Sequence, residues 1–247
     1  GSMRVCFRFA SDQTRPQFED PKGPNYTTIE ASNNAVLTYH YDPKGNVRPW
    51  DRTLYIQVVR GFLREGDKIT ITFGDRSGGS PGMRLQTFCE DSYEFHTLID
   101  PIATYCYQPM PVQPVIKIIP GKPDRYLAVT PTIRAIAESF SIKFKGADKW
   151  GNPSDQCDIQ LYQHASHPIK NLPNMVSLKP GEFFGVLEGL LVADAADLYI
   201  DFLDDAGVVM CRTNPIRIEP APLSRHFWGD LHGQSEETIG TGSAEAY

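Results

Sequence analysis

The chain has 247 residues, enough for one large domain or two of ordinary size, and 40% of them are hydrophobic and 22% charged. This balance is typical of a folded protein and argues against a disordered chain. The formal net charge of −6 at pH 7 leaves no basic surface of the kind that nucleic-acid binding needs, so we expect no nucleic-acid partner.

Aromatic and turn-forming residues are abundant: 13 Phe and 11 Tyr accompany 20 Pro and 20 Gly. This composition favours many short strands joined by turns over a helical bundle. The five cysteines form no CxxC pair and no zinc-ribbon spacing, so we expect buried thiols. With no signal peptide and no run of about 18 apolar residues, we expect no membrane partner. A reducing cytoplasm is favoured, and a periplasmic location stays open.

Residues 1–112 are predicted to form a β-rich first domain. Segments of alternating or β-branched residues predict its strands: 4–10, 36–41, 53–59, 68–73, 83–88 and 94–99. The glycine-rich loop 74–82 contains Arg76, Ser77 and Ser80, which could hold a phosphate through backbone amides and a guanidinium. The loop lacks the Lys-Ser/Thr ending of a phosphate loop, so a structural turn is the favoured interpretation.

A proline-rich hinge at 109–114 separates this domain from a second one, residues 113–222, which is predicted to be an immunoglobulin-like β-sandwich. Short strand-like segments recur at the spacing typical of that fold: 115–119, 125–129, 139–145, 157–163, 182–187, 198–203, 208–212 and 216–218. Trp150 is expected to anchor the core. Only residues 132–137 and 189–196 have short helical potential.

Two smaller features of the chain could also support chemistry. His164 and His167 have a chelating spacing, but no third ligand is evident, so a surface loop is favoured over a metal site. Glu90 and Asp91 are expected on solvated surface, as acidic residues usually are.

The C-terminal residues, 223–247, have the most specific chemical pattern. A short apolar segment ends in Gly229-Asp230-Leu231-His232, which places a carboxylate and an imidazole where a strand is expected to end, followed by a glycine and hydroxyl-rich loop. Strand ends of this kind bear the chemistry of α/β barrels. Asp230, His232 and Gln234 are therefore candidate site residues.

This pattern resembles the opening of the PHP superfamily of metal-dependent phosphoesterases. Within that superfamily the chain is most similar to a large bacterial group named for a domain of unknown function, DUF3604, which usually opens with Gly-Asp-Leu-His-x-His and then Ser or Thr. Gln234 stands where the second histidine is expected. An amide oxygen in place of an imidazole suits harder ions than zinc. The resemblance also extends upstream, through residues 74–82, 86–91 and 149–153.

The resemblance implies that residues 223–247 begin the first strand of a truncated α/β barrel. In the intact protein, His232 and Gln234 would be metal ligands for Mn, Zn or Mg, and Asp230 would be a catalytic-site carboxylate. The chain itself is expected to bind such ions weakly and to hydrolyse no phosphoester. Its expected partners are the remainder of its own hydrolase domain and, as one possibility, a second copy of itself. The two β-rich domains would then shape or scaffold the active site.

A different class of function stays open at this point. The β-rich domains could be a carbohydrate-binding or adhesion module attached to an enzyme whose activity lies elsewhere. Exposed aromatic residues on one sheet face would favour this alternative, whereas a polar groove opening toward Asp230 and His232 would favour a role in shaping the hydrolase substrate. A third possibility is that both domains serve only as a scaffold for oligomerisation.

Overall fold

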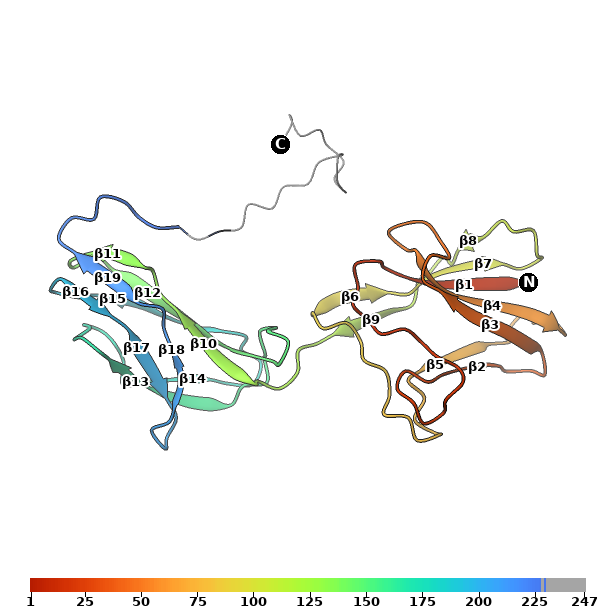
Figure 1. Cartoon of the computed structure of the whole chain (residues 1–247), viewed down its shortest axis with the longest axis horizontal. Helices are drawn as coiled ribbons and strands as arrows, with labels where there is room; N and C mark the ends of the chain where they lie inside the picture. The colour runs from red at the N-terminus through yellow and green to blue at the C-terminus, as the bar shows by residue number, and fades with distance from the viewer. Residues whose placement is uncertain (228, 230–247) are drawn as a thin grey trace, which may run out of the picture. The chain divides into compact units, whose positions relative to one another are not determined.

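The structure is a computed structural model that describes residues 1–227 and Gly229. It divides into two compact units, Gly1–Gly121 and a second that begins at Lys122 (Figure 1). Every regular element in the described part of the chain is a β-strand. The prediction of a mainly-β fold is therefore confirmed.

A five-stranded antiparallel sheet, in the order β3-β4-β1-β7-β8, is the largest element of the first unit (Figure 1). Its strands are β1 (Ser2–Phe7), β3 (Val36–Asp42), β4 (Arg52–Arg60), β7 (His96–Asp100) and β8 (Gln108–Pro109). Two antiparallel pairs complete the unit: β2 (Thr27–Ala31) with β5 (Ile69–Phe73), and β6 (Glu90–Glu94) with β9 (Val115–Ile118).

An aromatic cluster centred on Phe7 forms the core of the first unit. The ring centroid of Phe7 lies 5.7 Å from that of Phe73 and 5.8 Å from that of Phe95, both at edge-to-face angles. These are favourable geometries for aromatic pairs. Leu54 and Ile56 of β4 are almost fully buried beside this cluster, so the five-stranded sheet and the β2-β5 pair share one apolar interior.

The second unit contains a three-stranded sheet, β10-β12-β15, and a four-stranded sheet, β14-β13-β17-β18. The first is built from β10 (Arg125–Val129), β12 (Phe140–Ala147) and β15 (Gly185–Leu190). The second is built from β13 (Ile159–Ala165), β14 (Met175–Leu178), β17 (Ile200–Leu203) and β18 (Val209–Arg212). A small third sheet joins β11 (Ile133–Ala135), β16 (Ala196–Leu198) and β19 (Ile216–Glu219).

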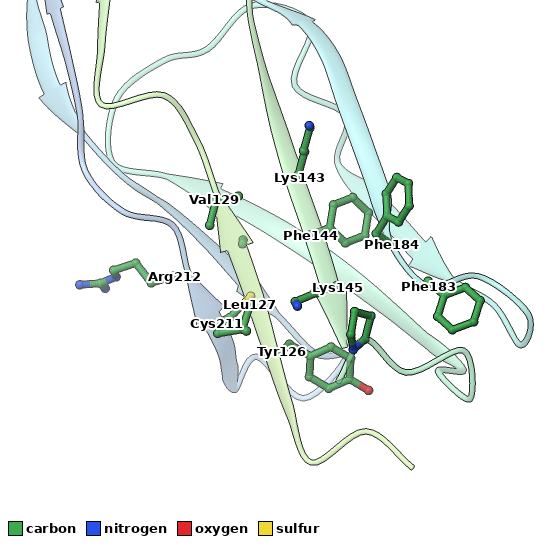
Figure 2. A pocket seen from close by; sticks show the side chains of 12 residues that line it. Tyr126, Leu127, Val129, Lys143, Phe144, Lys145, Phe183, Phe184, Cys211 and Arg212 are labelled. Atoms are coloured by element: carbon green, nitrogen blue, oxygen red, sulfur yellow. The ribbon is translucent and has the colours of Figure 1, made fainter. Parts of the chain in front are cut away.

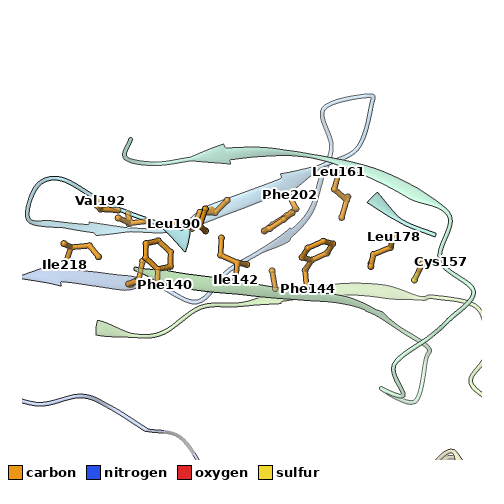
Figure 3. Packing of buried hydrophobic residues seen from close by; sticks show 14 residues of the cluster. Phe140, Ile142, Phe144, Cys157, Leu161, Leu178, Leu190, Val192, Phe202 and Ile218 are labelled. Atoms are coloured by element: carbon orange, nitrogen blue, oxygen red, sulfur yellow. The ribbon is translucent and has the colours of Figure 1, made fainter. Parts of the chain in front are cut away.

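Figure 3 shows the apolar layer between the strands of this unit. Phe140, Ile142 and Phe144 alternate along β12 and are buried, as expected for the inward face of a half-buried strand. Phe144 packs against Phe202 of β17 with ring centroids 5.6 Å apart. Full burial of such a side chain stabilises the folded state by roughly 1.5–3 kcal/mol. The buried residues of β12 therefore determine which side of this strand faces the core and which faces outward.

The boundary between the units differs from the predicted one at residues 112–113. Strand β9 pairs with β6 of the first unit and not with the second unit, so the first unit extends to Gly121. Residues 83–88 form no strand. Instead, the Nη2 atom of Arg84 donates to the Asp12 carbonyl at 2.8 Å, and Gln86 donates to Glu90 at 2.9 Å.

Two predictions for the second unit were wrong. Trp150 is 50% exposed and is not a core anchor. The Asp148 carboxylate accepts the backbone N–H groups of Trp150 and Asn152, at 2.9 and 3.0 Å, and this turn leaves the indole at the surface, where the Lys149 ammonium lies 4.8 Å from its ring. Neither expected helical turn forms: residues 132–137 contain the strand β11, which pairs in parallel with β19, and residues 189–196 contain the end of β15 and the first residue of β16.

The expectations for thiols and acids also need correction. Cys6 and Cys157 are buried, but Cys89 and Cys106 are exposed. Glu90 is not on a solvated face, because its carboxylate forms an ion pair with Arg8 and accepts from the buried Gln86.

Candidate binding face of the second unit

The predicted metal and catalytic residues Asp230, His232 and Gln234 lie outside the described residues. Within residues 1–227 and Gly229, no group of three or more His, Cys, Asp or Glu side chains is placed to hold a metal ion. His164 is at the surface, as expected, but it lies on strand β13 and not in a loop, whereas His167 follows the strand. The same part of the chain has no helix with the length and apolar character that a membrane span requires.

The glycine-rich loop 74–82 is held by its own hydrogen bonds. The Asp75 carboxylate accepts the backbone N–H of Ser77 at 2.9 Å and the hydroxyl of Thr28 at 2.8 Å. The hydroxyl of Ser80 accepts the N–H of Gly82 at 3.1 Å, and Ser80 itself is buried. These contacts are those of a structural turn, as expected, and they occupy polar groups that a phosphate would need.

An unusual surface lies on the outer side of the β10-β12-β15 sheet. In the register of this sheet, Lys145 lies opposite Leu127, and Lys143 lies opposite Val129 on one side and Val186 on the other. Directly paired residues of antiparallel strands project to the same side of a sheet. Phe184, which directly precedes β15, lines the same cavity as both lysines. We call this set the lysine face: Leu127, Val129, Lys143, Lys145, Phe184 and Val186.

The apolar members of the lysine face are well exposed. Phe184 is 62% exposed and Val129 is 56% exposed, while Leu127 and Val186 are more than one third exposed. An antiparallel sheet with one face on the core normally presents polar residues on the other. Here the three residues of β10 and β15 that lie opposite the two β12 lysines are all apolar: Leu127, Val129 and Val186. Exposed apolar side chains that adjoin one another make this surface a candidate site for contact with another molecule.

A cavity of about 610 Å³ lies over this region (Figure 2). Every member of the lysine face except Val186 lines it, together with Phe183 and Pro153. Its other walls are the core-facing Tyr126, Ala128 and Phe144, with Cys211 and Arg212 of β18, so the cavity touches both sides of the sheet. The volume is within the range of sites that bind small molecules or side chains of a partner. The Phe144 ring packs closely against the backbone of Gly185 in the cavity wall. A Cβ atom added at Gly185 would lie 2.3 Å from the Phe144 Cζ atom.

The cationic groups around the cavity differ in their partners. Arg212 donates from Nε to Asp201 Oδ1 at 2.6 Å and from Nη2 to Oδ2 at 2.9 Å, and its guanidinium lies 3.9 Å from the Tyr199 ring. These hydrogen bonds raise the pKa of Arg212 above its usual value. Lys143 and Lys145, by contrast, form no ion pair with any described residue. The uncompensated positive charge of the cavity therefore belongs to the two lysines.

Cys211 completes the β18 side of the cavity. Burial and, secondarily, the nearby Asp201 carboxylate raise the pKa of its thiol to about 11. Since the thiolate is the reactive form, Cys211 is a weak nucleophile at neutral pH. The cavity thus offers apolar contact and positive charge, which are means of binding.

The lysine face was missed in the sequence although a signal was present. Residues 126–129 are a continuous apolar run, which suggests a strand covered on both sides, and β12 shows lysines alternating with buried phenylalanine. Only the pairing of β12 with β10 and β15 reveals that these residues adjoin one another.

Comparisons with known proteins give no family for this chain. No protein-family profile matches it, and a search of curated proteins finds no relative. Among solved structures, the D00-D0 domain of intimin matches 81% of this chain and 96% of its own at 9% identity, with a TM-score of 0.34. The Escherichia coli adhesin FdeC (12% identity, TM-score 0.29) and the Yersinia pseudotuberculosis adhesin InvE (6% identity, TM-score 0.30) each match 78% of this chain. The matches span 53% of FdeC and 49% of InvE. TM-scores this low do not establish a shared fold or function.

Proposed function

We propose that this chain is a binding module whose second unit, an immunoglobulin-like sandwich, contacts a partner through the lysine face. The observation that supports this most is the placement of two ammonium groups without carboxylate partners among exposed apolar side chains. Apolar contact supplies affinity in such interfaces, whereas charge selects the partner and speeds association. The proposed partner surface is therefore partly apolar and bears negative charge.

The chemistry of the cavity favours an anion over a neutral sugar. Its walls contain Phe, Tyr, Leu, Val, Pro, Lys, Arg and Cys side chains, and none of the Asn, Gln, Asp or Glu side chains that would orient several hydroxyl groups. Of the adhesion and carbohydrate-binding possibilities, we therefore propose adhesion to an anionic, partly apolar partner.

Titration with 1-anilinonaphthalene-8-sulfonate, an apolar anion that fluoresces on binding exposed apolar surface, tests this proposal. We expect saturable binding to the folded chain, weakened about tenfold or more by the double change Lys143→Glu with Lys145→Glu. Lys170→Glu, at an exposed lysine outside the cavity, is the matched control and should change the affinity little. Phe184→Ser should also weaken binding, in contrast to Val208→Ser at an exposed apolar residue elsewhere in the unit. Equal affinities in all five proteins would refute the proposal.

A second candidate function follows from the Gly229-Asp230-Leu231-His232 motif. We propose that, in a longer protein, Asp230, His232 and Gln234 contribute to a divalent-metal phosphoesterase site, to which the two β-rich units would be attached. Metal analysis of such a protein and of its His232→Ala variant tests this. Unchanged metal content and unchanged phosphoesterase activity in the variant would exclude His232 as a ligand.

A further inference from the structure

We infer that the occupant of the lysine face is an extended peptide segment with acidic side chains at two alternate positions. This inference rests on the proposed function and narrows it to one class of partner. It follows from the spacing of the two lysines and from the apolar rows beside them.

The spacing of the lysines matches that of an extended chain. Lys143 and Lys145 are two residues apart on one strand, so their Cα atoms are separated by about 6.5–7 Å. Residues i and i+2 of any extended peptide have the same separation and project to the same side. A peptide that runs along β12 can therefore place one carboxylate at each ammonium group, whereas a ligand with a single carboxylate can neutralise only one.

The lysines form a cationic row between two apolar rows. Val129 and Val186 flank Lys143 on the neighbouring strands, which lie about 4.8 Å away on each side. The apolar side chains on both sides lower the exposure of the lysine row to water and strengthen a charge pair formed with a lysine. They also accept the methylene groups of Glu side chains, which favours Glu over a compact inorganic anion.

The lysine face ends at Lys145. The next pair along the two strands, Tyr126 and Gly146, projects to the inner side of the sheet, where Tyr126 packs against the core. The predicted pattern is therefore acidic, any residue, acidic.

Fluorescence anisotropy with a labelled hexapeptide, Ser-Glu-Thr-Glu-Thr-Phe, tests this pattern against an isomer of the same composition, Ser-Glu-Glu-Thr-Thr-Phe. We expect the first peptide to bind the full chain more tightly and to displace 1-anilinonaphthalene-8-sulfonate. Lys143→Gln and Lys145→Gln should each weaken its binding about three- to fivefold, the effect of an exposed charge pair of up to about 1 kcal/mol, and Lys170→Gln should not.

The outcomes separate this inference from the proposed function. If the fluorescent anion binds in a lysine-dependent way but the two peptides bind equally or not at all, the peptide pattern is overturned and the binding module stands. If an oligogalacturonate displaces the anion at lower concentration than the peptide, the occupant is an acidic polysaccharide and the inference is also overturned. If the anion itself does not depend on the lysines, both proposals fall.

Discussion

Lys143 of β12 lies directly opposite Val129 of β10 in the antiparallel register. A lysine in this position normally extends toward an acidic neighbour or into open water; here its cross-strand neighbour is a half-exposed valine. The pair therefore contributes little to folding. A lysine beside an exposed valine is what we expect in a surface that another molecule covers.

Replacing that valine separates binding from stability. Val129→Thr keeps the β-branched shape and removes apolar surface, so we expect the free energy of unfolding to change by less than about 0.5 kcal/mol while the affinity for 1-anilinonaphthalene-8-sulfonate falls. Urea unfolding and fluorescence titration measure the two effects. The contrasting variant is Ile142→Ala on the buried side of the same sheet, which should cost about 2–5 kcal/mol. A large loss of stability in Val129→Thr would show that this face is structural.

Releasing Arg212 should have the opposite effect on anion binding. Asp201→Asn removes the carboxylate that holds Arg212 through two hydrogen bonds and leaves its guanidinium charge uncompensated at the cavity wall. We expect the dissociation constant of the fluorescent anion to fall about two- to fivefold at low salt, and this gain to disappear at high salt because exposed charges are screened. The comparison variant is Asp197→Asn, whose carboxylate pairs with Arg217 away from the cavity. Equal effects of the two changes would contradict the assignment of the site.

The close approach of Gly185 to Phe144 predicts that changes at these two residues have strongly non-additive effects on stability. An added Cβ would meet the Phe144 ring at 2.3 Å, and Phe144 is buried between the sheets, so Gly185→Ala should destabilise the unit by about 1–3 kcal/mol. Phe144→Leu destabilises the unit by itself, but it removes the Phe144 Cζ atom that an added Cβ at Gly185 would meet. In a double-mutant cycle, Gly185→Ala should therefore cost less in the Phe144→Leu background. Additive effects would mean that the two residues do not contact.

The Cys211 thiol predicts an alkaline loss of stability. Its pKa is raised from the ordinary value of 9.0 to about 11, so the unfolded chain releases this proton at lower pH than the folded chain does. The contribution of the neutral thiol is full below about pH 9 and is lost progressively up to about pH 11. Urea unfolding across this range should show a smaller decline for Cys211→Val than for the parent chain. Parallel declines would show that Cys211 does not titrate in this way.

The reactivity of the thiols offers a related test. At neutral pH we expect iodoacetamide to modify the exposed Cys106 much faster than Cys211 in the folded chain, because partial burial limits access to the Cys211 thiol and keeps it protonated. Peptide mapping by mass spectrometry gives the two rates. In urea the rates should converge, which controls for differences in local sequence.

Local patterns were sufficient to predict the mainly-β class and many strands, such as β4 and β12, whose apolar residues alternate. They were insufficient wherever a distant partner decides the outcome. Strand β9 belongs to the first unit only because β6 pairs with it, and β11 is a strand only because β19 lies beside it. Trp150 is exposed because the side chain of Asp148 shapes its turn.

The site shows the same limit. The lysines of β12 and the apolar residues of β10 are visible in the sequence, but their adjacency is a matter of register. Asp230, His232 and Gln234, the residues with the strongest chemical pattern, lie outside the described part of the chain, so their roles stay predictions.

Mapping of the bound anion by nuclear magnetic resonance tests the central claim most directly. Isotope-labelled chain would be titrated with 1-anilinonaphthalene-8-sulfonate while the backbone amide signals are followed. We predict that the largest saturable shifts occur at Leu127, Val129, Lys143, Lys145 and Val186, with little change in the first unit or in β13. Shifts that concentrate in the first unit, or that fail to saturate at the lysine face, would contradict the assignment of this surface as the binding site.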